Sequence, residues 1–181
     1  MEIKTKRLLL RPYVIDDLTD VYEYASQKKV AQAAGFTAVS DIRGALLFLE
    51  VLQNQGALAI YSHLHQKVIG NISFYPSFAS SKFELGYALN SNYWQRGYMT
   101  EALQALCKTL DDKEVLAYVY PNNEASLRLL QKCNFEAQGS WRKGQSYLNI
   151  SGKRYHLKAK NYTNSQSFER GLESIIKAFS I

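Results

Sequence analysis

Hydrophobic and polar positions alternate along residues 83–89, and this pattern predicts a β-strand. The apolar side chains occupy every second position, as Phe83, Leu85, Tyr87 and Leu89. A few residues later the spacing becomes that of one helix face, with Met99, Ala102, Leu103, Leu106 and Leu110. The change of period predicts a strand that leads into an amphipathic helix through a short polar and aromatic link.

The same signals divide the rest of the chain. Strands are expected at residues 8–10, 58–61, 68–74, 115–119 and 135–143, and from 147 onward. Asp16 or Asp17 can cap a helix that ends near Ala25, and Ser40 can cap one that ends near Asn54. A further helix follows Asn123, and a short one is expected at 168–179. Elements in this order predict a three-layer α/β domain.

The length of 181 residues fits one domain, which we expect to span residues 1–165, followed by a C-terminal tail over 166–181. No apolar stretch approaches the roughly 20 residues of a membrane helix, and the first residues lack the apolar core of an export signal. Cys107 and Cys133 fit no metal spacing and are expected to be free thiols. These features predict a cytoplasmic protein with reduced cysteines.

The net charge of +6 is unevenly distributed. Basic and acidic residues balance over residues 1–139, so the excess comes from residues 140–181. Its core is a run without acidic residues that contains Arg142, Lys143, Lys153, Arg154, Lys158 and Lys160. The run is either a solubilising surface or a field that attracts an anionic partner, such as cofactor phosphates, an acidic acceptor or nucleic acid.

The first candidate site is the link into the helix, residues 94–100. A helix that begins directly after a glycine-containing turn presents unpaired N–H groups and the positive end of its dipole, which together bind phosphate. A second block covers residues 122–135, where Asn123 can cap the helix and Asn134 can adopt the left-handed conformation after it.

Other common sites are absent from the sequence. It contains neither a Walker A motif nor a Gly-x-Gly-x-x-Gly motif. His63 and His65 are expected on one face of a strand, but only His156 remains as a third nitrogen ligand, so no metal site is expected.

Together the two blocks resemble the GNAT superfamily of N-acetyltransferases, in particular the branch of ribosomal-protein N-terminal alanine acetyltransferases. The likeness covers residues 5–162 and is strongest over 84–87, 94–102 and 123–135. It implies an α/β (α+β) fold of three layers, with a central mixed, mostly antiparallel, twisted sheet flanked by helices.

The resemblance also implies a site for acetyl-CoA. The pyrophosphate would be held by backbone N–H groups of the turn residues Gln95, Arg96, Gly97, Tyr98, Met99 and Thr100. The backbone of Leu89 would pair with the pantetheine arm, Asn123 would contact the arm, and Ser126 would lie near the thioester sulfur. No metal is implied.

The expected reaction moves the acetyl group from acetyl-CoA to a primary amine, of a protein N-terminus or a small molecule, by direct attack. Glu84 is the candidate general base, because it lies on a strand face with the small residues Gly86 and Ala88. The alternative is that Glu84 is a solvated strand carboxylate. Leu130 stands where many relatives have a tyrosine that acts as the general acid. Ser126, water or a tyrosine of the basic segment therefore remains as the proton donor.

Departures from the family pattern leave the acceptor open. Gln95 and Met99 replace small residues of the turn, Asn134 replaces a glycine, and Leu157 follows His156 where relatives carry a His-Asp pair. We expect the partners to be acetyl-CoA and an amine acceptor with acidic groups near its amine. No contact with a membrane is expected, and the protein is expected to be a monomer or a homodimer. The alternative is a catalytically degenerate GNAT-fold module that binds acyl-CoA or nucleic acid.

Overall fold

The computed structural model describes residues 1–76, 83–110, 115–117, 119, 123–142, 145–150 and 156–157. Within these residues seven strands form one sheet in the order β1-β2-β3-β4-β5-β6-β9. Their bounds are β1 Ile3–Lys4, β2 Leu8–Pro12, β3 Leu58–Ser62, β4 Lys67–Pro76, β5 Phe83–Leu89, β6 Val115–Ala117 and β9 His156–Leu157. β6 runs parallel to β5 and β9, and the other neighbours are antiparallel. The expected mixed, mostly antiparallel sheet is confirmed.

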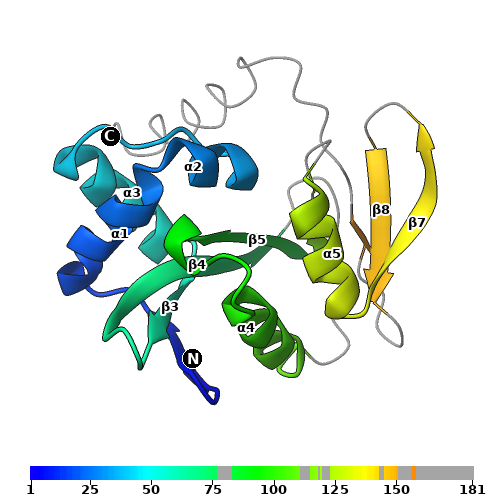
Figure 1. Cartoon of the computed structure of the whole chain (residues 1–181), viewed down its shortest axis with the longest axis horizontal. Coiled ribbons are helices and arrows are strands. Elements are labelled where there is room, and N and C mark those ends of the chain that lie inside the picture. The colour runs from blue at the N-terminus through cyan, green and yellow to red at the C-terminus, as the bar shows by residue number, and fades with distance from the viewer. Residues whose placement is uncertain are drawn as a thin grey trace.

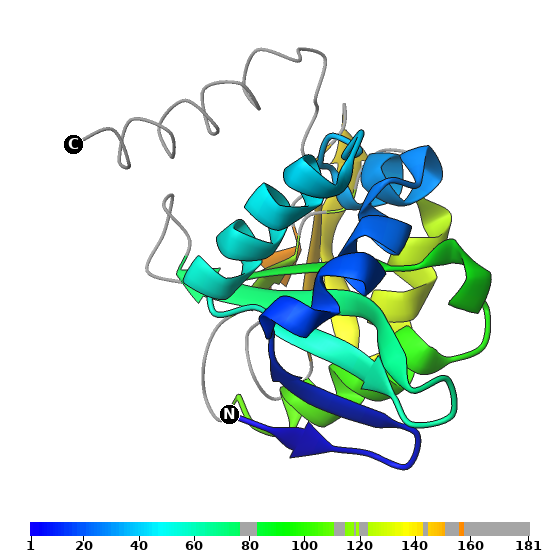
Figure 2. The same ribbon diagram turned by 90° about the vertical axis from the view of Figure 1, so that its left-hand side faces the viewer.

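Helices cover both faces of this sheet (Figures 1 and 2). One face packs against α1 (Leu18–Ala25), α2 (Lys28–Ala34) and α3 (Ile42–Asn54), and the other against α4 (Tyr98–Cys107) and α5 (Glu124–Lys132). The strands β7 (Phe135–Arg142) and β8 (Gln145–Ile150) form a separate pair next to α5. The three-layer arrangement is therefore confirmed.

Each helix layer has its own hydrophobic cluster. In the first cluster, Tyr24 of α1 and Leu49 of α3 are fully buried. In the second cluster, Leu103 and Leu106 of α4 and Leu130 of α5 are fully or almost fully buried. Burying a leucine side chain contributes about 1.5–3 kcal/mol. The face of β5 that carries Leu85 and Leu89 packs into the second cluster, as the alternation predicted.

Some sequence predictions were wrong. The N-cap of α3 is Asp41 rather than Ser40, because the Asp41 carboxylate accepts the Gly44 N–H at 2.8 Å. The Ser40 hydroxyl instead donates to Asp41, and a carboxylate also interacts better with the helix dipole. His63 and His65 lie in the turn between β3 and β4, not on a strand face. The short elements α2 and β1 were not predicted.

Two expected features lie outside the described residues. These are the terminal helix at 168–179 and most of the basic run after residue 142. Among the residues that the structure describes, no helix is long and apolar enough to cross a membrane.

Gly70 brings β4 unusually close to the end of β5. A Cβ atom at Gly70 would lie 2.2 Å from the Ala88 carbonyl oxygen and 2.9 Å from the Leu89 Cα. The Tyr13 hydroxyl holds the same segment by donating to the Gly70 carbonyl at 3.0 Å. Only glycine fits here, so this contact sets the position of the last residues of β5.

We expect Gly70→Ala to lower the free energy of unfolding by at least about 1–3 kcal/mol, the usual effect of overpacking. The control is Gly44→Ala in α3, where the nearest atom to the new Cβ would be the Val39 Cβ at 3.5 Å. It should be neutral or stabilising by up to about 1 kcal/mol, because alanine favours helix. Urea denaturation of both variants measures this, and equal destabilisation would contradict it.

Candidate active site

The β5 strand has an open edge at its C-terminal end. β6 pairs only with Phe83–Leu85, so among the described strands β5 has no neighbour on that side beyond Leu85. The Asn90 N–H donates to the Ile69 carbonyl of β4 at 2.8 Å. Because bonds alternate in an antiparallel ladder, the backbone groups of Tyr87 and Leu89 face the open edge. There the Leu89 carbonyl accepts the Trp94 indole N–H at 2.7 Å.

A buried amide fixes the start of the link between β5 and α4. Asn90 is fully buried, and its Oδ1 accepts the Gln27 side-chain N–H and the Asn92 N–H, both at 3.0 Å. Its Nδ2 donates to Glu23 at 2.8 Å. Hydrogen bonding to Lys67, partly opposed by burial, lowers the pKa of Glu23. The C-terminal end of α1 therefore holds the link in place.

The link ends in a turn with two residues in the left-handed region. Gln95 has φ 61° and Gly97 has φ 75°, and α4 begins at the next residue, Tyr98. The backbone N–H groups of residues 95–100 donate to no acceptor in the described part of the chain. Consecutive free N–H groups at a helix N-terminus form an anion site.

The two large residues of this turn are accommodated without blocking its backbone. The Gln95 side chain is exposed, and Met99 is only 6% exposed within the hydrophobic cluster beneath α4. Since such a turn binds anions through its N–H groups, neither departure from the family pattern removes the anion site.

A pocket of about 520 Å³ lies between α2, the end of β5, the turn and α5. Its volume is within the range of about 300–1,000 Å³ found for small-molecule sites. The predicted residues that line it are Leu89, Gln95, Gly97, Tyr98, Met99, Thr100, Asn123 and Ser126. The structure thus brings most of the predicted cofactor residues together, whereas Arg96 and Glu84 are outside this lining.

Asn123 connects two walls of the pocket. Its Oδ1 accepts the Ser126 N–H at 3.1 Å, which confirms it as the N-cap of α5. Its Nδ2 donates to the Ala33 carbonyl in α2 at 3.1 Å. At the other end of α5, Asn134 has φ 62°, so its predicted left-handed conformation is also confirmed.

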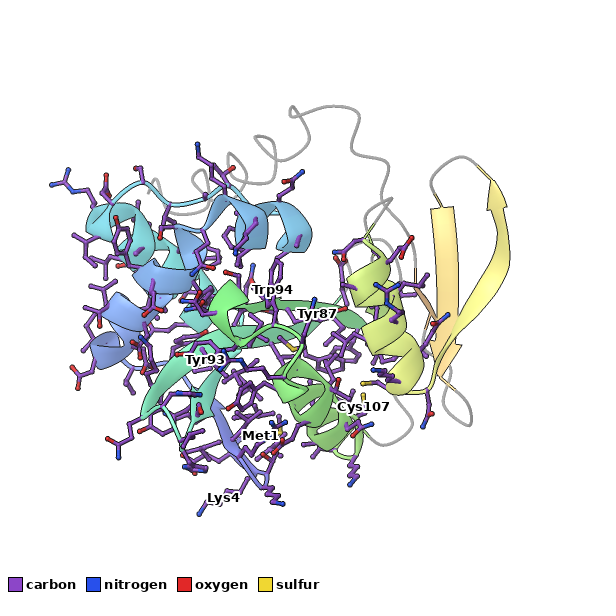
Figure 3. All side chains as sticks on the ribbon, viewed as in Figure 1. Met1, Lys4, Tyr87, Tyr93, Trp94 and Cys107 are labelled. Atoms are coloured by element: carbon purple, nitrogen blue, oxygen red, sulfur yellow. The ribbon has the colours of Figure 1, made fainter. Side chains whose placement is uncertain are left out.

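Ser126 lies beside a tyrosine that sequence reasoning missed. Its Oγ is 2.5 Å from the Tyr87 hydroxyl, and both residues line the pocket (Figure 3 labels Tyr87). Burial raises the pKa of Tyr87, and the hydrogen bond with Ser126 offsets only part of this rise. Tyr87 therefore stays protonated at neutral pH. In the alternating pattern of residues 83–89 Tyr87 counts as an apolar residue. Its hydroxyl group was the signal that could have marked it as a functional residue.

Glu84 lies on the opposite face of β5 from Tyr87, in the half-buried first part of the strand. On the same face, β4 carries two polar residues that sequence reasoning also missed. Asn71 is 6% and Ser73 is 5% exposed, and the Asn71 amide is 3.4 Å from the Ser73 hydroxyl. The Asn71 Oδ1 has no hydrogen-bond partner in the described structure. A buried unpaired acceptor costs about 1–3 kcal/mol.

The two cysteines are free thiols, as predicted. Burial raises the pKa of Cys107 to about 11 and that of Cys133 to about 12, with a small further rise of the latter from Cys107. Neither supplies a thiolate nucleophile near neutral pH. No group of three or more His, Cys, Asp or Glu residues in the described part of the chain has the arrangement of a metal site.

Comparisons with known proteins agree with this geometry. Residues 7–136 match the family model of the acetyltransferase (GNAT) domain. The uncharacterized N-acetyltransferase YnaD of Bacillus subtilis is 30% identical over 158 residues, which cover 79% of this chain and 87% of YnaD. A solved GNAT-family acetyltransferase from Bacillus anthracis superposes with a TM-score of 0.68 at 26% identity, covering 77% of this chain and 86% of that chain.

A more distant structure shares the fold. It is RimL, a ribosomal L7/L12 alpha-N-protein acetyltransferase in complex with coenzyme A. Its TM-score is 0.65 at 18% identity, and the match covers 86% of this chain and 94% of that chain. The family model, the relative in Bacillus subtilis and the shared fold lead to one conclusion: the chain belongs to the GNAT family of acetyltransferases.

Proposed function

We propose that this protein transfers an acetyl group from acetyl-CoA to a primary amine, of a protein N-terminus or a small molecule, by direct attack. The observation that carries the proposal is the set of free N–H groups at residues 95–100, all of which except Arg96 line the pocket that also contains Ser126 and Tyr87. One end of that pocket suits a diphosphate, and the other supplies two hydroxyl groups.

In this proposal acetyl-CoA binds in the pocket in one orientation. The diphosphate of acetyl-CoA binds the N–H groups at the start of α4, and the pantetheine arm follows the open edge of β5 past Leu89 and Tyr87. Asn123 keeps α2 and α5 together over the arm. The thioester then lies near Ser126. The complex of RimL with coenzyme A supports this choice of cofactor.

In the transfer step the amine nitrogen attacks the thioester carbonyl carbon, the C–S bond breaks, and the nitrogen loses a proton. Glu84, which lies on the other face of β5 and outside the pocket lining, takes this proton through water. The Ser126 hydroxyl, held by Tyr87, donates a hydrogen bond to the departing sulfur, and the thiolate then takes its proton from solvent water, so Tyr87 stays protonated throughout. Neither cysteine lines the pocket and burial raises the pKa of both, so the acetyl group passes to the amine without a cysteine intermediate. Holding the two reactants in line supplies about 7–11 kcal/mol.

The acceptor class follows from charge. The basic run from Arg142 to Lys160 contains no acidic residue, and it follows the part of the chain that holds the donor site. A positive field attracts anionic partners and raises their rate of association. We therefore propose that the acceptor carries acidic groups near its amine.

The first test measures release of free CoA with a panel of amines and N-terminal peptides. We expect turnover by the wild type, and we expect Glu84→Gln to lower kcat by about 10²–10⁴-fold, the usual contribution of a general base. Acetyl-CoA should still raise the melting temperature of this variant. Unchanged turnover would exclude Glu84 as the base.

Thermal stabilisation by acetyl-CoA without CoA release from any amine would instead favour a degenerate acyl-CoA-binding module. Affinity for nucleic acid that falls steeply with salt would favour the nucleic-acid alternative.

The second test compares two glycines with positive φ. Gly97→Ala should weaken acetyl-CoA binding about tenfold, because an alanine there favours a different backbone conformation by about 1–2 kcal/mol. Gly56→Ala is the matched control, since Gly56 has φ 66° and no heavy atom within 4 Å of the new Cβ. It should lose similar stability and keep its affinity for acetyl-CoA, as measured by calorimetry. Equal effects on affinity would contradict this role of Gly97.

The third test concerns the acceptor. Peptides with Asp or Glu next to the amine should give a higher kcat/KM than neutral peptides, and the difference should shrink as salt rises. Equal values at low salt would contradict the proposal of an acidic acceptor.

A further inference from the structure

Arg7 contacts the turn before α4 and is not part of the pocket lining. It precedes β2, yet its Nη1 donates to the Arg96 carbonyl at 2.9 Å and its Nε to Glu101 Oε2 at 2.6 Å. Its guanidinium also lies 4.3 Å from the centroid of the Tyr98 ring. These partners all belong to the segment that forms the turn and the first turn of α4.

The bond to Arg96 determines the direction of the next N–H group. In a planar trans peptide the C=O and the following N–H point in opposite directions. Since the Arg96 carbonyl points to Arg7, the Gly97 N–H points away from it. This direction agrees with the pocket lining, which includes Gly97 and neither Arg96 nor Arg7. Glycine tolerates many backbone conformations, so without a partner this peptide could rotate easily.

Glu101 in turn holds Arg7 in place. Its Oε1 accepts the Thr5 hydroxyl at 2.6 Å and the Arg7 backbone N–H at 2.8 Å, while Oε2 accepts the Arg7 Nε. Burial raises the pKa of Glu101. The hydrogen bonds from Thr5 and Arg7, together with the Arg7 charge, lower it by more than burial raises it, so the pKa lies below its ordinary value. Glu101 is therefore ionised at neutral pH and anchors the guanidinium.

We propose that Arg7 is a positioning residue for the diphosphate of acetyl-CoA, which holds the Arg96–Gly97 peptide with its N–H directed into the pocket. Arg7 acts through this peptide and does not itself bind the cofactor. The inference rests on the proposed function, because it assigns a role within the same donor site.

The test compares two donors, acetyl-CoA and S-acetylpantetheine, which lacks the diphosphate. Arg7→Gln should raise KM for acetyl-CoA at least tenfold and leave KM for S-acetylpantetheine and for the amine unchanged. Arg7→Lys, which can still donate to the Arg96 carbonyl, should recover part of the affinity for acetyl-CoA. If Arg7 had a merely structural role, Arg7→Gln would change KM for both donors by the same factor.

Arg11→Gln is the matched control. Arg11 is on β2 and forms a two-bond ion pair with Asp17, with both distances 2.7 Å, so its loss removes a comparable interaction. This variant should lose stability and keep KM for both donors. The proposal is overturned if Arg7→Gln affects both donors equally, affects neither, or behaves as Arg11→Gln does.

Calorimetry with CoA separates the two proposals. If the wild type binds CoA and transfers nothing, the proposed function fails, and Arg7 is still tested by the Kd of each variant for CoA. If the wild type transfers acetyl groups and Arg7→Gln binds CoA with unchanged Kd, only the role of Arg7 fails.

Discussion

The free N–H groups at the start of α4 are the feature on which the rest of the site depends. A helix N-terminus always leaves several donors unpaired, but here the preceding turn adds to them, so that the N–H groups of residues 95–100 have no acceptor in the described part of the chain. Three separate parts of the fold hold these groups in position. Gly70 sets the end of β5, Asn90 ties the link to α1, and Arg7 fixes the peptide before Gly97.

The sequence predicted the elements of the donor site because their signals are local. The change from alternating to helical spacing located β5 and α4, and the side-chain rules for helix ends located Asn123 and the left-handed Asn134. The turn could be recognised for the same reason. A backbone site depends on a glycine and a helix start, both of which are visible in a short stretch of sequence.

What sequence reasoning missed depends on contacts between distant segments. Arg7 and Glu101 are 94 residues apart, and Tyr87 meets Ser126 across 39 residues. No local pattern marks such pairs, and Tyr87 in particular was counted as apolar because its ring fits the alternation of β5. The position of Glu84 outside the pocket lining likewise follows from which strand face meets the cavity, and no sequence spacing reports this.

The two halves of the site thus differ in how they are built. The proposed donor half relies on backbone groups, so it tolerates Gln95, whose side chain is exposed, and Met99, which is buried, in place of small residues. In the proposed function, acceptor recognition depends on side chains, and the basic run after residue 140 is the candidate for it.

The most direct measurement is a ¹H–¹⁵N NMR titration with acetyl-CoA. The account predicts that the amide signals of residues 95–100 shift most, followed by those of Tyr87 and Leu89. Unchanged signals at residues 95–100, with acetyl-CoA bound elsewhere or not at all, would contradict it.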